Sequence, residues 1–322
     1  MKSAVSLFPD LKTIAQNPQR LDLRNNLCPG CGINMILSSF LRVTSDPIVI
    51  ANATGCSEIC LSPFPETFMK CSWIHSLFEN SASVISGVES AFNVFSRKNL
   101  LTKTQKKTKF LAIGGDGASS DIGLQWISGA VERGHDFTYL CLDNEGYMNT
   151  GAQRSSSVPR NFATTTSPLG KRECGKAQPR KNLTSIMIVH DISYVAQINP
   201  AFNLDLMKKA HKAFETKGPS FINSFSPCPT EWKHAPEQGI TIARLATESG
   251  LWPLYEVYKG KYRINHKSTN HISALKEFFS LQKRTKHLLE KKNREIFNSA
   301  VERINLEWEK LLKLEQTFPW QD

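Results

Sequence analysis

Short apolar runs that end in glycine or polar residues dominate the first two thirds of the chain. Three of them, 46–53 (DPIVIANA), 109–114 (KFLAIG) and 137–142 (FTYLCL), predict buried strands. Between the second and third, residues 121–133 (DIGLQWISGAVER) carry apolar residues at helical spacing, and Ser119 or Ser120 is expected to cap that helix. Strand, helix and strand at this spacing predict a right-handed βαβ unit with parallel strands.

The alternating pattern continues after this unit. Residues 150–182 are polar and rich in Ser, Thr and Pro, which predicts a long functional loop. A further strand and helix are expected within 184–217, and residues 221–225 (FINSF) predict a strand that leads towards Cys228. We therefore expect an α/β fold of the doubly wound kind, built on a mostly parallel sheet.

Two more segments have a helical pattern. Residues 81–95 (SASVISGVESAFNVF) place small residues at helical spacing, which suits close packing against another helix or a subunit. Residues 271–314 also repeat apolar positions at helical spacing. The apolar side there comprises Val301, Ile304, Trp308 and Leu311. The chain is accordingly divided into a main domain over 1–265 and a helical C-terminal extension over 266–322.

Composition narrows the class of protein. The chain has 322 residues, of which 40% are hydrophobic, enough to bury one large domain or two moderate ones. The apolar run before Pro9 is too short for a secretion signal, and no window approaches the roughly 20 apolar residues of a membrane span. We expect a cytoplasmic protein whose eight cysteines are reduced, metal-bound or catalytic rather than paired.

Basic residues outnumber acidic ones and cluster in two stretches. The formal net charge is +11. Residues 97–109 carry six Lys or Arg and no acidic residue, and residues 160–181 carry six against Glu173. Neither stretch interleaves its charges with aromatic residues or belongs to a nucleic-acid reading module, so no nucleic acid is expected as a partner. The stretches fit solvated loops or, alternatively, a docking face for an acidic protein.

Cys28 and Cys31, in NLCPGCG, form a Cys-x-x-Cys pair. Such a pair serves as half of a metal site, as a redox dithiol or as a tight turn. A dithiol of the thioredoxin kind needs a preceding strand, and residues before Cys28 do not predict one. Structural zinc prefers a second close pair, and the next candidates are Cys56 and Cys60. Spacing alone therefore leaves zinc open, and leaves Cys60 as an alternative ligand to Cys56 or Cys228.

Polar residues follow both strands of the βαβ unit. Gly115-Asp116-Gly117 comes where the first strand ends, and Asn144 comes where the second ends. Because the carboxyl ends of parallel strands meet at one edge of the sheet, these side chains are expected to lie close together. A carboxylate and an amide oxygen suit Mg²⁺, which completes its coordination with phosphate oxygens. A Gly-Asp-Gly sequence alone also fits an ordinary turn, but with Asn144 it predicts a Mg²⁺-bound diphosphate.

The run GGDGASSDIGLQWISGAVERGHDFTYLCLDNEGYMNTGAQRSSSVP resembles the thiamine-diphosphate domain of the 2-oxoacid:ferredoxin oxidoreductases, specifically the beta subunit of the pyruvate type. The resemblance covers roughly residues 20–260 and implies a thiamine-diphosphate-binding domain. It implies that Asp116, Asn144 and the carbonyl of Gly146 hold Mg²⁺, and that Asn149 lies beside the cofactor's thiazolium and the substrate as the catalytic residue.

The resemblance implies further cofactor contacts and a second cofactor. The remaining contacts to thiamine diphosphate would come from Gly115, Gly117, Thr150 and His75, although a lone histidine between apolar residues is more often structural. The family also holds a [4Fe-4S] cluster, for which four thiolates are the usual ligands. The implied ligands are Cys28, Cys31, Cys56 and Cys228. Cys71, Cys141 and Cys174 are expected to have no ligand role.

The implied reaction is the oxidative decarboxylation of pyruvate to acetyl-CoA and CO₂, with electrons passed to ferredoxin. The Asn-Thr-Gly segment that begins at Asn149 favours pyruvate or a branched-chain 2-oxoacid over 2-oxoglutarate, and glyoxylate or oxalate are further alternatives. The resemblance also implies an alpha-type subunit that supplies the pyrimidine-binding domain, together with gamma-type and ferredoxin-like delta-type subunits. Two other classes were considered: a thiamine-diphosphate enzyme with structural zinc and no cluster, and a non-catalytic binding subunit.

Overall fold

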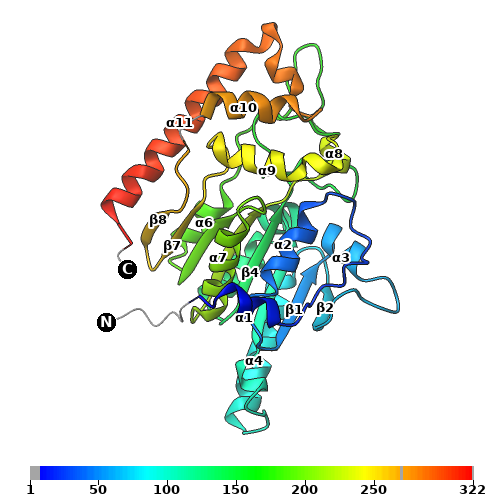
Figure 1. Cartoon of the computed structure of the whole chain (residues 1–322), viewed down its shortest axis with the longest axis vertical. Coiled ribbons are helices and arrows are strands. Elements are labelled where there is room, and N and C mark those ends of the chain that lie inside the picture. Colours follow the sequence, from blue (N-terminus) through cyan, green and yellow to red (C-terminus); the bar gives the residue numbers. More distant parts are fainter. Residues whose placement is uncertain (1–7, 269–270, 321–322) are drawn as a thin grey trace.

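In the computed structural model, which describes residues 8–268 and 271–320, the strands form one eight-stranded sheet with helices on both faces (Figure 1). The strand order is β2-β1-β3-β4-β6-β5-β7-β8; the first six strands are parallel, and β7 and β8 are antiparallel. The bounds are β1 (Ile48–Ala53), β2 (Ser72–Ser76), β3 (Lys109–Gly115), β4 (Thr138–Asp143), β5 (Tyr194–Ile198), β6 (Ser220–Phe225), β7 (Tyr255–Tyr258) and β8 (Lys261–Ile264).

The predicted βαβ unit and fold class are confirmed. Strands β3 and β4 pair directly in parallel, and α5 (Leu124–Glu132) connects them. The helix begins later than expected because residues Ala118–Ile122 form a π-helical turn. The expected cap is wrong: the Ser119 hydroxyl donates to the Gly115 carbonyl at 2.7 Å, inside that turn, and Gly123 occupies the position before the helix.

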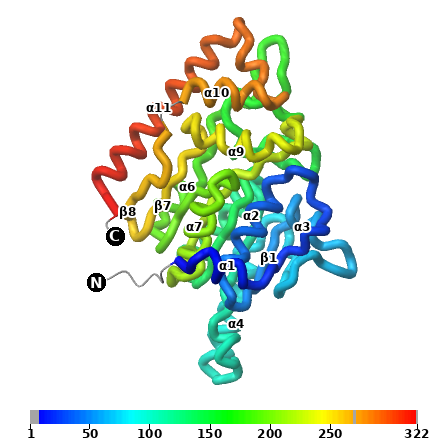
Figure 2. The backbone as a smooth tube through the Cα atoms, viewed as in Figure 1, coloured from blue at the N-terminus to red at the C-terminus, as the bar shows by residue number. Residues whose placement is uncertain are grey.

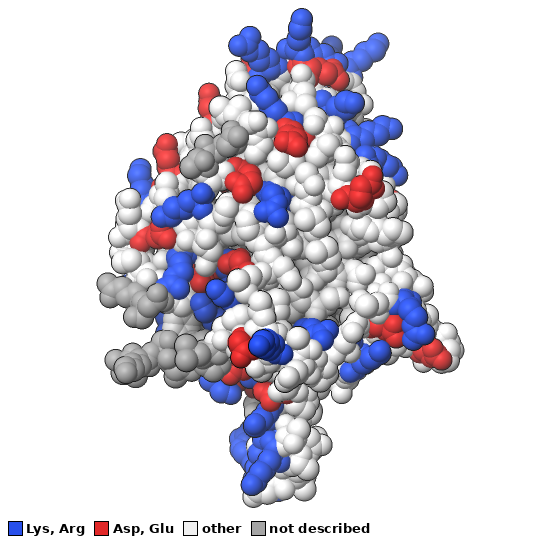
Figure 3. Space-filling view, in the orientation of Figure 1, with Lys and Arg blue, Asp and Glu red and all other residues white. Residues whose placement is uncertain are grey.

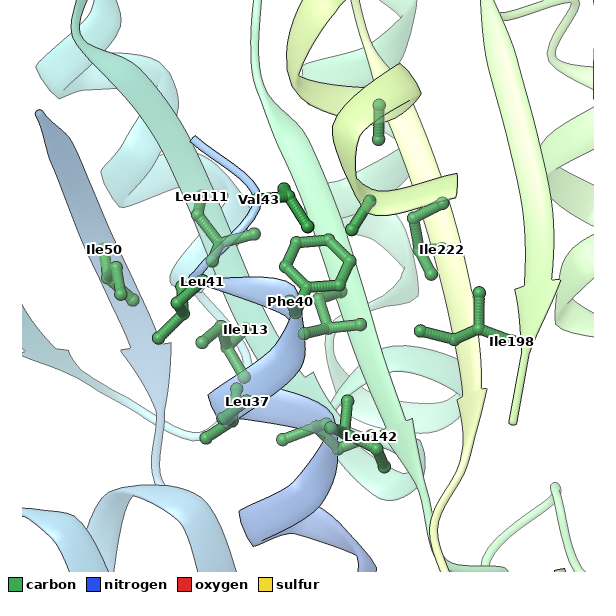
Figure 4. Packing of buried hydrophobic residues seen from close by; sticks show 14 of the residues in the cluster. Leu37, Phe40, Leu41, Val43, Ile50, Leu111, Ile113, Leu142, Ile198 and Ile222 are labelled. Atoms are coloured by element: carbon green, nitrogen blue, oxygen red, sulfur yellow. The ribbon is translucent and has the colours of Figure 1, made fainter. Parts of the chain in front are cut away.

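Alternate residues of the central strands face two different cores, as the two-residue period of a strand requires. On one face, α2 (Gly32–Phe40) and α7 (Asn203–Glu215) cover the sheet. Figure 4 shows Leu37 and Phe40 of α2 packed towards strand residues such as Leu142. On the other face lie α4 (Ser81–Arg97), α5 and α6 (Leu183–Val189). The two layers fix the positions of the strand ends.

Three strands were not expected from the sequence. Strand β2 is a partly exposed edge strand, and β7 and β8 form a hairpin of four residues a side. Lys259 and Gly260 join the hairpin with φ of +47° and +74°, a conformation that the Lys-Gly pair supports. The strand and helix expected within 184–217 are β5 and α7, and one helix that was not expected, α6, precedes them.

The helical C-terminal pattern is confirmed in part. Helix α10 (His271–Ser280) and helix α11 (Arg294–Thr317) are separated by residues 281–293, which form short turns. Ile304 and Leu311 of the expected apolar side are buried. Helices α8 (Pro229–Trp232), α9 (Gly239–Glu248) and α10 share a third core with residues of the 150–182 loop. The extension therefore packs against the loop that follows β4.

The two basic stretches have different surroundings. Helix α4 and the residues after it project from the body of the molecule (Figures 1 and 2), and Lys or Arg side chains gather on this projection (Figure 3). In the 160–181 stretch, by contrast, Lys176 is 1% exposed and Arg180 lies in a buried ion pair, so a solvated loop is the wrong description of these two residues. None of the described helices is long and apolar enough to cross a membrane.

The remaining helices are short. They are α1 (Leu11–Gln16) and α3 (Cys56–Leu61). Helix α3 begins directly after β1, at the same edge of the sheet as the turns that follow β3 and β4.

Candidate active site

Asp116, Asn144 and Gly146 meet at the carboxyl ends of β3 and β4. The Asp116 side chain is 0% exposed, and Asn144 is 7% exposed. The Asn144 side-chain amide lies 3.0 Å from Asp116 Oδ1 and 2.9 Å from the Gly146 carbonyl oxygen, and its NH₂ group, turned towards them, donates to both. The residues that the sequence analysis grouped are thus within contact distance of one another. We call the turn formed by residues 144–146 together with Asp116 the metal turn.

The oxygen spacing in the metal turn limits what it can hold. With its NH₂ group turned towards them, the Asn144 amide donates to both acceptors. With its oxygen turned towards them, the three oxygens would repel one another unless a cation lay among them. Ligands of an octahedral Mg²⁺ lie 2.0–2.1 Å from the metal, which places neighbouring ligand oxygens about 3 Å apart. The two separations from the Asn144 amide are compatible with a Mg²⁺ ligand set once the amide oxygen faces the metal, and a carboxylate, an amide and a carbonyl are oxygen donors of the required kind.

Hydrogen bonds hold Asp116 in place. The Gly146 N–H donates to Asp116 Oδ2 at 2.8 Å, and the Ser155 hydroxyl donates to the same oxygen. Burial raises the pKa of Asp116 well above its usual range, and the charge of nearby Asp143 raises the pKa further. A cation bound at the metal turn would therefore lower the pKa of Asp116 and favour its ionised form.

Open space adjoins the ends of two neighbouring strands. A Cβ added to Gly115, at the end of β3, or to Gly55, after β1, would meet no atom within 4 Å. This leaves room for a ligand to approach the backbone at both positions. At Gly117, by contrast, a Cβ would lie 2.4 Å from the Tyr147 ring. Gly117 therefore has a packing reason for being glycine, which the sequence analysis did not identify.

His75 lies at the end of edge strand β2 and is not a core histidine. Its ring Nε2 is 3.0 Å from Thr54 Oγ1, and its Nδ1 is 3.3 Å from Glu58 Oε1. About half of the His75 side chain is exposed, whereas Glu58 is buried. Burial raises the pKa of Glu58, and the histidine opposes that rise. Thr54 and Glu58 thus orient the ring near Gly55 and engage both ring nitrogens, so donation to an anion would require the ring to give up one of these partners.

Asn149 and Thr150 follow the metal turn after Tyr147 and Met148, and both are exposed. The Thr150 hydroxyl donates to Gln153 Oε1 at 2.5 Å. Tyr147, between these residues and the metal turn, donates its hydroxyl to Asp121 at 3.0 Å and stacks on Phe78. The exposed pair is thus carried on a turn anchored to the π-helical segment.

Three segments bring the predicted cysteines to the same end of the sheet. Cys56 begins α3, and Cys228 immediately precedes α8. The Cys-x-x-Cys turn closes with a hydrogen bond from the Cys31 N–H to the Cys28 carbonyl at 3.0 Å. The next residue, Gly32, donates its N–H to the carbonyl of Pro227 at 3.0 Å, which ties this turn to the segment of Cys228. We call these segments the cysteine loops.

Burial dominates the chemistry of these thiols. It raises the pKa of Cys56 to about 12 and that of Cys228 to about 11. The pKa of Cys31 also rises through burial, and the neighbouring thiols at 28, 56 and 228 raise it further. Several thiolates would repel one another here, so their ionised form requires a positively charged group. Binding such a group would release protons.

The cysteine loops do not form a compact site for one metal ion. Among the described residues, no three His, Cys, Asp or Glu side chains are grouped closely enough to hold a metal. A cluster distributes its thiolates over four iron atoms, whereas zinc requires four ligands around one centre. Cys60 interacts with Cys28 and Cys56, so it remains an alternative ligand. Outside this group, Cys141 is buried, and Cys71 and Cys174 are partly buried.

Sequence reasoning missed the charged residues that support the metal turn. Arg180 pairs with Asp143 and, at 2.9 Å, with Glu145, while Arg284 pairs with Glu145 at 2.6 Å. Ser155 was missed as well, although it stands in the serine run that follows the quoted motif. Asp143 and Glu145 flank Asn144 in the sequence, so their closeness to the metal turn could have been predicted from the sequence. Nothing in the sequence near Arg284 indicated its role.

The fold and site define the class of protein. The model of the thiamine pyrophosphate enzyme C-terminal TPP-binding domain matches residues 53–224, which include both strands that carry the metal turn. A solved 2-oxoglutarate:ferredoxin oxidoreductase from Magnetococcus marinus shares the fold, with a TM-score of 0.57 and 20% identity over 86% of this chain and 93% of that one.

Relatives place the chain more closely within this class. Pyruvate synthase subunit PorB of Methanocaldococcus jannaschii is 46% identical over 81% of this chain and 87% of its own length. PorB of Thermotoga maritima is 39% identical over 95% and 97%. Ketoisovalerate oxidoreductase subunit VorB of Pyrococcus furiosus is 37% identical over 90% and 92%. The chain belongs to the beta-subunit family of the 2-oxoacid:ferredoxin oxidoreductases.

Proposed function

We propose that this chain is the thiamine-diphosphate- and [4Fe-4S]-binding subunit of an enzyme that converts pyruvate and coenzyme A into acetyl-CoA and CO₂ and passes electrons to ferredoxin. The observation that carries the proposal is the meeting of Asp116, Asn144 and Gly146, where the Asn144 amide lies 2.9–3.0 Å from the Gly146 carbonyl oxygen and Asp116 Oδ1, so that turning its oxygen inward would complete a Mg²⁺ ligand set. The PorB relatives support pyruvate as the substrate.

The residues present fit Mg²⁺ and a diphosphate. Asp116 Oδ1, the Asn144 side-chain oxygen and the Gly146 carbonyl would hold the metal. The open space beside Gly115 and Gly55 would receive the diphosphate, within reach of the backbone. When bound, thiamine diphosphate supplies the carbanion chemistry. The chain's own residues bind and orient it.

Other residues near the carboxyl ends of the strands have distinct roles in the proposal. His75 would donate to the diphosphate from Nε2, exchanging its contact with the Thr54 hydroxyl for a phosphate oxygen. Asn149 and Thr150, exposed on the turn after the metal turn, contact the cofactor and the substrate. Ser155 holds the Asp116 carboxylate so that Oδ1 stays directed at the metal.

Cys28, Cys31, Cys56 and Cys228 would hold the [4Fe-4S] cluster. Their thiols lie close together, and Cys228 is buried while Cys31 and Cys56 are partly buried, so their ionised forms need the positive charge of the irons. The cluster would accept electrons from the cofactor and pass them on towards ferredoxin. Structural zinc is the competing occupant of these cysteines.

The proposal requires partner chains. The names of the relatives describe subunits. An alpha-type subunit would contribute the pyrimidine-binding domain, and gamma-type and ferredoxin-like delta-type subunits would complete the complex. Exposed apolar side chains on α4, α5 and the turn before α5 are compatible with a subunit contact there, since contiguous apolar patches mark interaction sites. These side chains are Val94, Phe95, Ile122 and Trp126.

The test is cofactor retention by the complex purified with its co-expressed partners. Asp116→Ala removes one metal ligand and should release thiamine diphosphate on gel filtration in Mg²⁺ buffer, with at least a 100-fold loss of affinity. Glu66→Ala, at an exposed loop position, is the control and should retain the cofactor. Equal retention by both variants would refute the metal assignment.

The substrate is tested by comparing turnover of pyruvate with that of the branched-chain 2-oxoacid 2-ketoisovalerate, which the VorB relative favours as a second candidate. With coenzyme A and ferredoxin present, we expect the larger kcat/KM for pyruvate. A larger kcat/KM for 2-ketoisovalerate would support the same reaction class but contradict the proposal that pyruvate is the substrate.

A further inference from the structure

We propose that Arg284, which lies between α10 and α11, is a positioning residue that holds the metal turn in its binding conformation and connects it to α8. The inference rests on the proposed function, because it takes the metal turn to be a Mg²⁺ site. It gives the C-terminal extension a part in cofactor binding.

Glu145 is the residue through which Arg284 acts. It lies between Asn144 and Gly146 and is 0% exposed, with φ of +59°. A residue other than glycine holds this left-handed conformation only where its surroundings enforce it. Here the enforcement comes from two guanidinium groups, with Arg180 on Oε1 at 2.9 Å and Arg284 on Oε2 at 2.6 Å.

Arg284 also contacts the other side of the metal turn through Trp232. The guanidinium lies 3.6 Å from the centre of the Trp232 ring. The indole N–H of Trp232 donates to the Asn144 main-chain carbonyl at 2.9 Å. One side chain therefore contacts both groups that restrain the turn, namely the Glu145 carboxylate and the indole bonded to Asn144.

The same contacts extend to the cysteine loops. Trp232 is the last residue of α8, whose first residue follows Cys228 directly. On the opposite side, the main-chain carbonyl of Arg284 accepts from the Ala163 N–H at 3.0 Å, and its guanidinium lies 5.0 Å from the Phe162 ring centre. Arg284 thus joins the metal turn, α8 and the 150–182 loop.

Stability alone is a weak reason for this arrangement. Burying a charged network costs desolvation, which the attraction between the charges only partly offsets. Within the described part of the chain, Arg284 Nη1 is buried without a hydrogen-bond partner, so the network is also incompletely satisfied. The network does hold residues 144–146 in a defined geometry. This requires arginine at position 284, because only a planar, forked donor can both pair with Glu145 and stack on Trp232.

The test measures metal binding by the assembled complex rather than its activity. Mn²⁺ in the presence of thiamine diphosphate is the probe, and the loss of its free electron paramagnetic resonance signal reports binding. Arg284→Lys keeps the charge but loses the fork, and should weaken Mn²⁺ binding 10- to 100-fold. Lys283→Met, at the exposed neighbouring position, is the matched control and should bind as the wild type does.

A second variant separates positioning from stability. Arg284→Met combined with Glu145→Gln removes both charges, so no unpaired charge is left buried. We expect its thermal midpoint to recover towards the wild-type value while Mn²⁺ binding stays weak. If the double variant or Arg284→Lys binds Mn²⁺ as the wild type does, the inference is overturned and the proposed function stands. If the wild type itself binds no Mn²⁺ with thiamine diphosphate, the proposed function fails and the inference fails with it.

Discussion

The metal turn and the cysteine loops lie at the same end of the sheet, but they are held in different ways. The metal turn comes from the ends of two adjacent strands, and its carboxylate receives hydrogen bonds from Gly146 and Ser155. The cysteine loops come from three separate segments, joined by main-chain bonds such as that from Gly32 to Pro227. Cys28 is exposed, whereas Asp116 is 0% exposed.

This difference concerns how much of each site the protein forms before its ligand arrives. In the metal turn, the Asn144 amide already lies within 3.0 Å of both Asp116 Oδ1 and the Gly146 carbonyl oxygen. The cysteine loops have thiols whose pKa values are raised by burial, and no three His, Cys, Asp or Glu side chains of the described residues are grouped closely enough to hold one metal ion. We infer that a ligand adds little order to the metal turn, and that a cluster would draw the cysteine loops together.

The largest expected effect is on iron content. Cys228→Ala in the anaerobically purified complex should lose the cluster of this chain, which is about four irons and four sulfides. The metal turn should still bind Mn²⁺ with thiamine diphosphate, because Trp232 is unchanged. Cys71→Ala, at a cysteine outside the proposed ligand set, is the control and should keep its iron.

Two results would contradict this prediction. Zinc in place of iron would identify a structural metal site. A cluster that survives Cys228→Ala but is lost in Cys60→Ala would mean that the local spacing of cysteines, rather than the family resemblance, identifies the ligands.

A smaller effect is expected from adding one methyl group to the Cys-x-x-Cys turn. Gly30 has φ of +75°, and a Cβ there would lie 2.3 Å from the main-chain carbonyl oxygen of Pro236. Gly134 has φ of +72° with no atom within 4 Å of an added Cβ, which makes Gly134→Ala a matched control. That control should cost about 1–2 kcal/mol for the left-handed conformation alone.

Gly30→Ala should cost more than this control, because the turn must also move away from Pro236. Thermal unfolding measures the free-energy difference, and iron analysis shows whether the change reaches the cluster. Equal destabilisation and equal iron content in the two variants would mean that the close approach at Gly30 has no bearing on the cysteine loops.

The smallest effect is expected from removing Mg²⁺ from the wild-type complex. A chelator should release thiamine diphosphate and lower the stability by about 1.4 kcal/mol where the free ligand had been at ten times its Kd. The iron content should not change, and adding Mg²⁺ with thiamine diphosphate should restore the thermal midpoint. Loss of iron on this treatment would show that the two sites are not independent.

Much of the central fold could be predicted, because buried strands and amphipathic helices have distinct periods. Strands β3, β4 and β6 were found from their apolar runs. Strand β2 was missed because it is a partly exposed edge strand, and β7 and β8 because each has only four residues. The helix start near residue 121 was misplaced because Ser119 bonds to the preceding turn instead of capping.

The candidate site divides in the same way. The closeness of Asp116 and Asn144 could be predicted because adjacent parallel strands end at the same edge of the sheet. The positions of Arg180 and Arg284 at this site could not be predicted. Arg180 is 37 positions from Asp143 in the sequence, and Arg284 is 139 positions from Glu145. No periodic pattern relates residues at such separations.

The sequence by itself determined the order of strands and helices around the metal turn, the motif that identifies the family and the cysteines available to it. These features are local, because each depends on neighbouring residues along the chain. Only the tertiary structure decided which charges are buried, and so drew Arg284 from the C-terminal extension to Glu145. The physical reason is that a buried charge is tolerated only beside a compensating one, and folding determines which distant residue provides it.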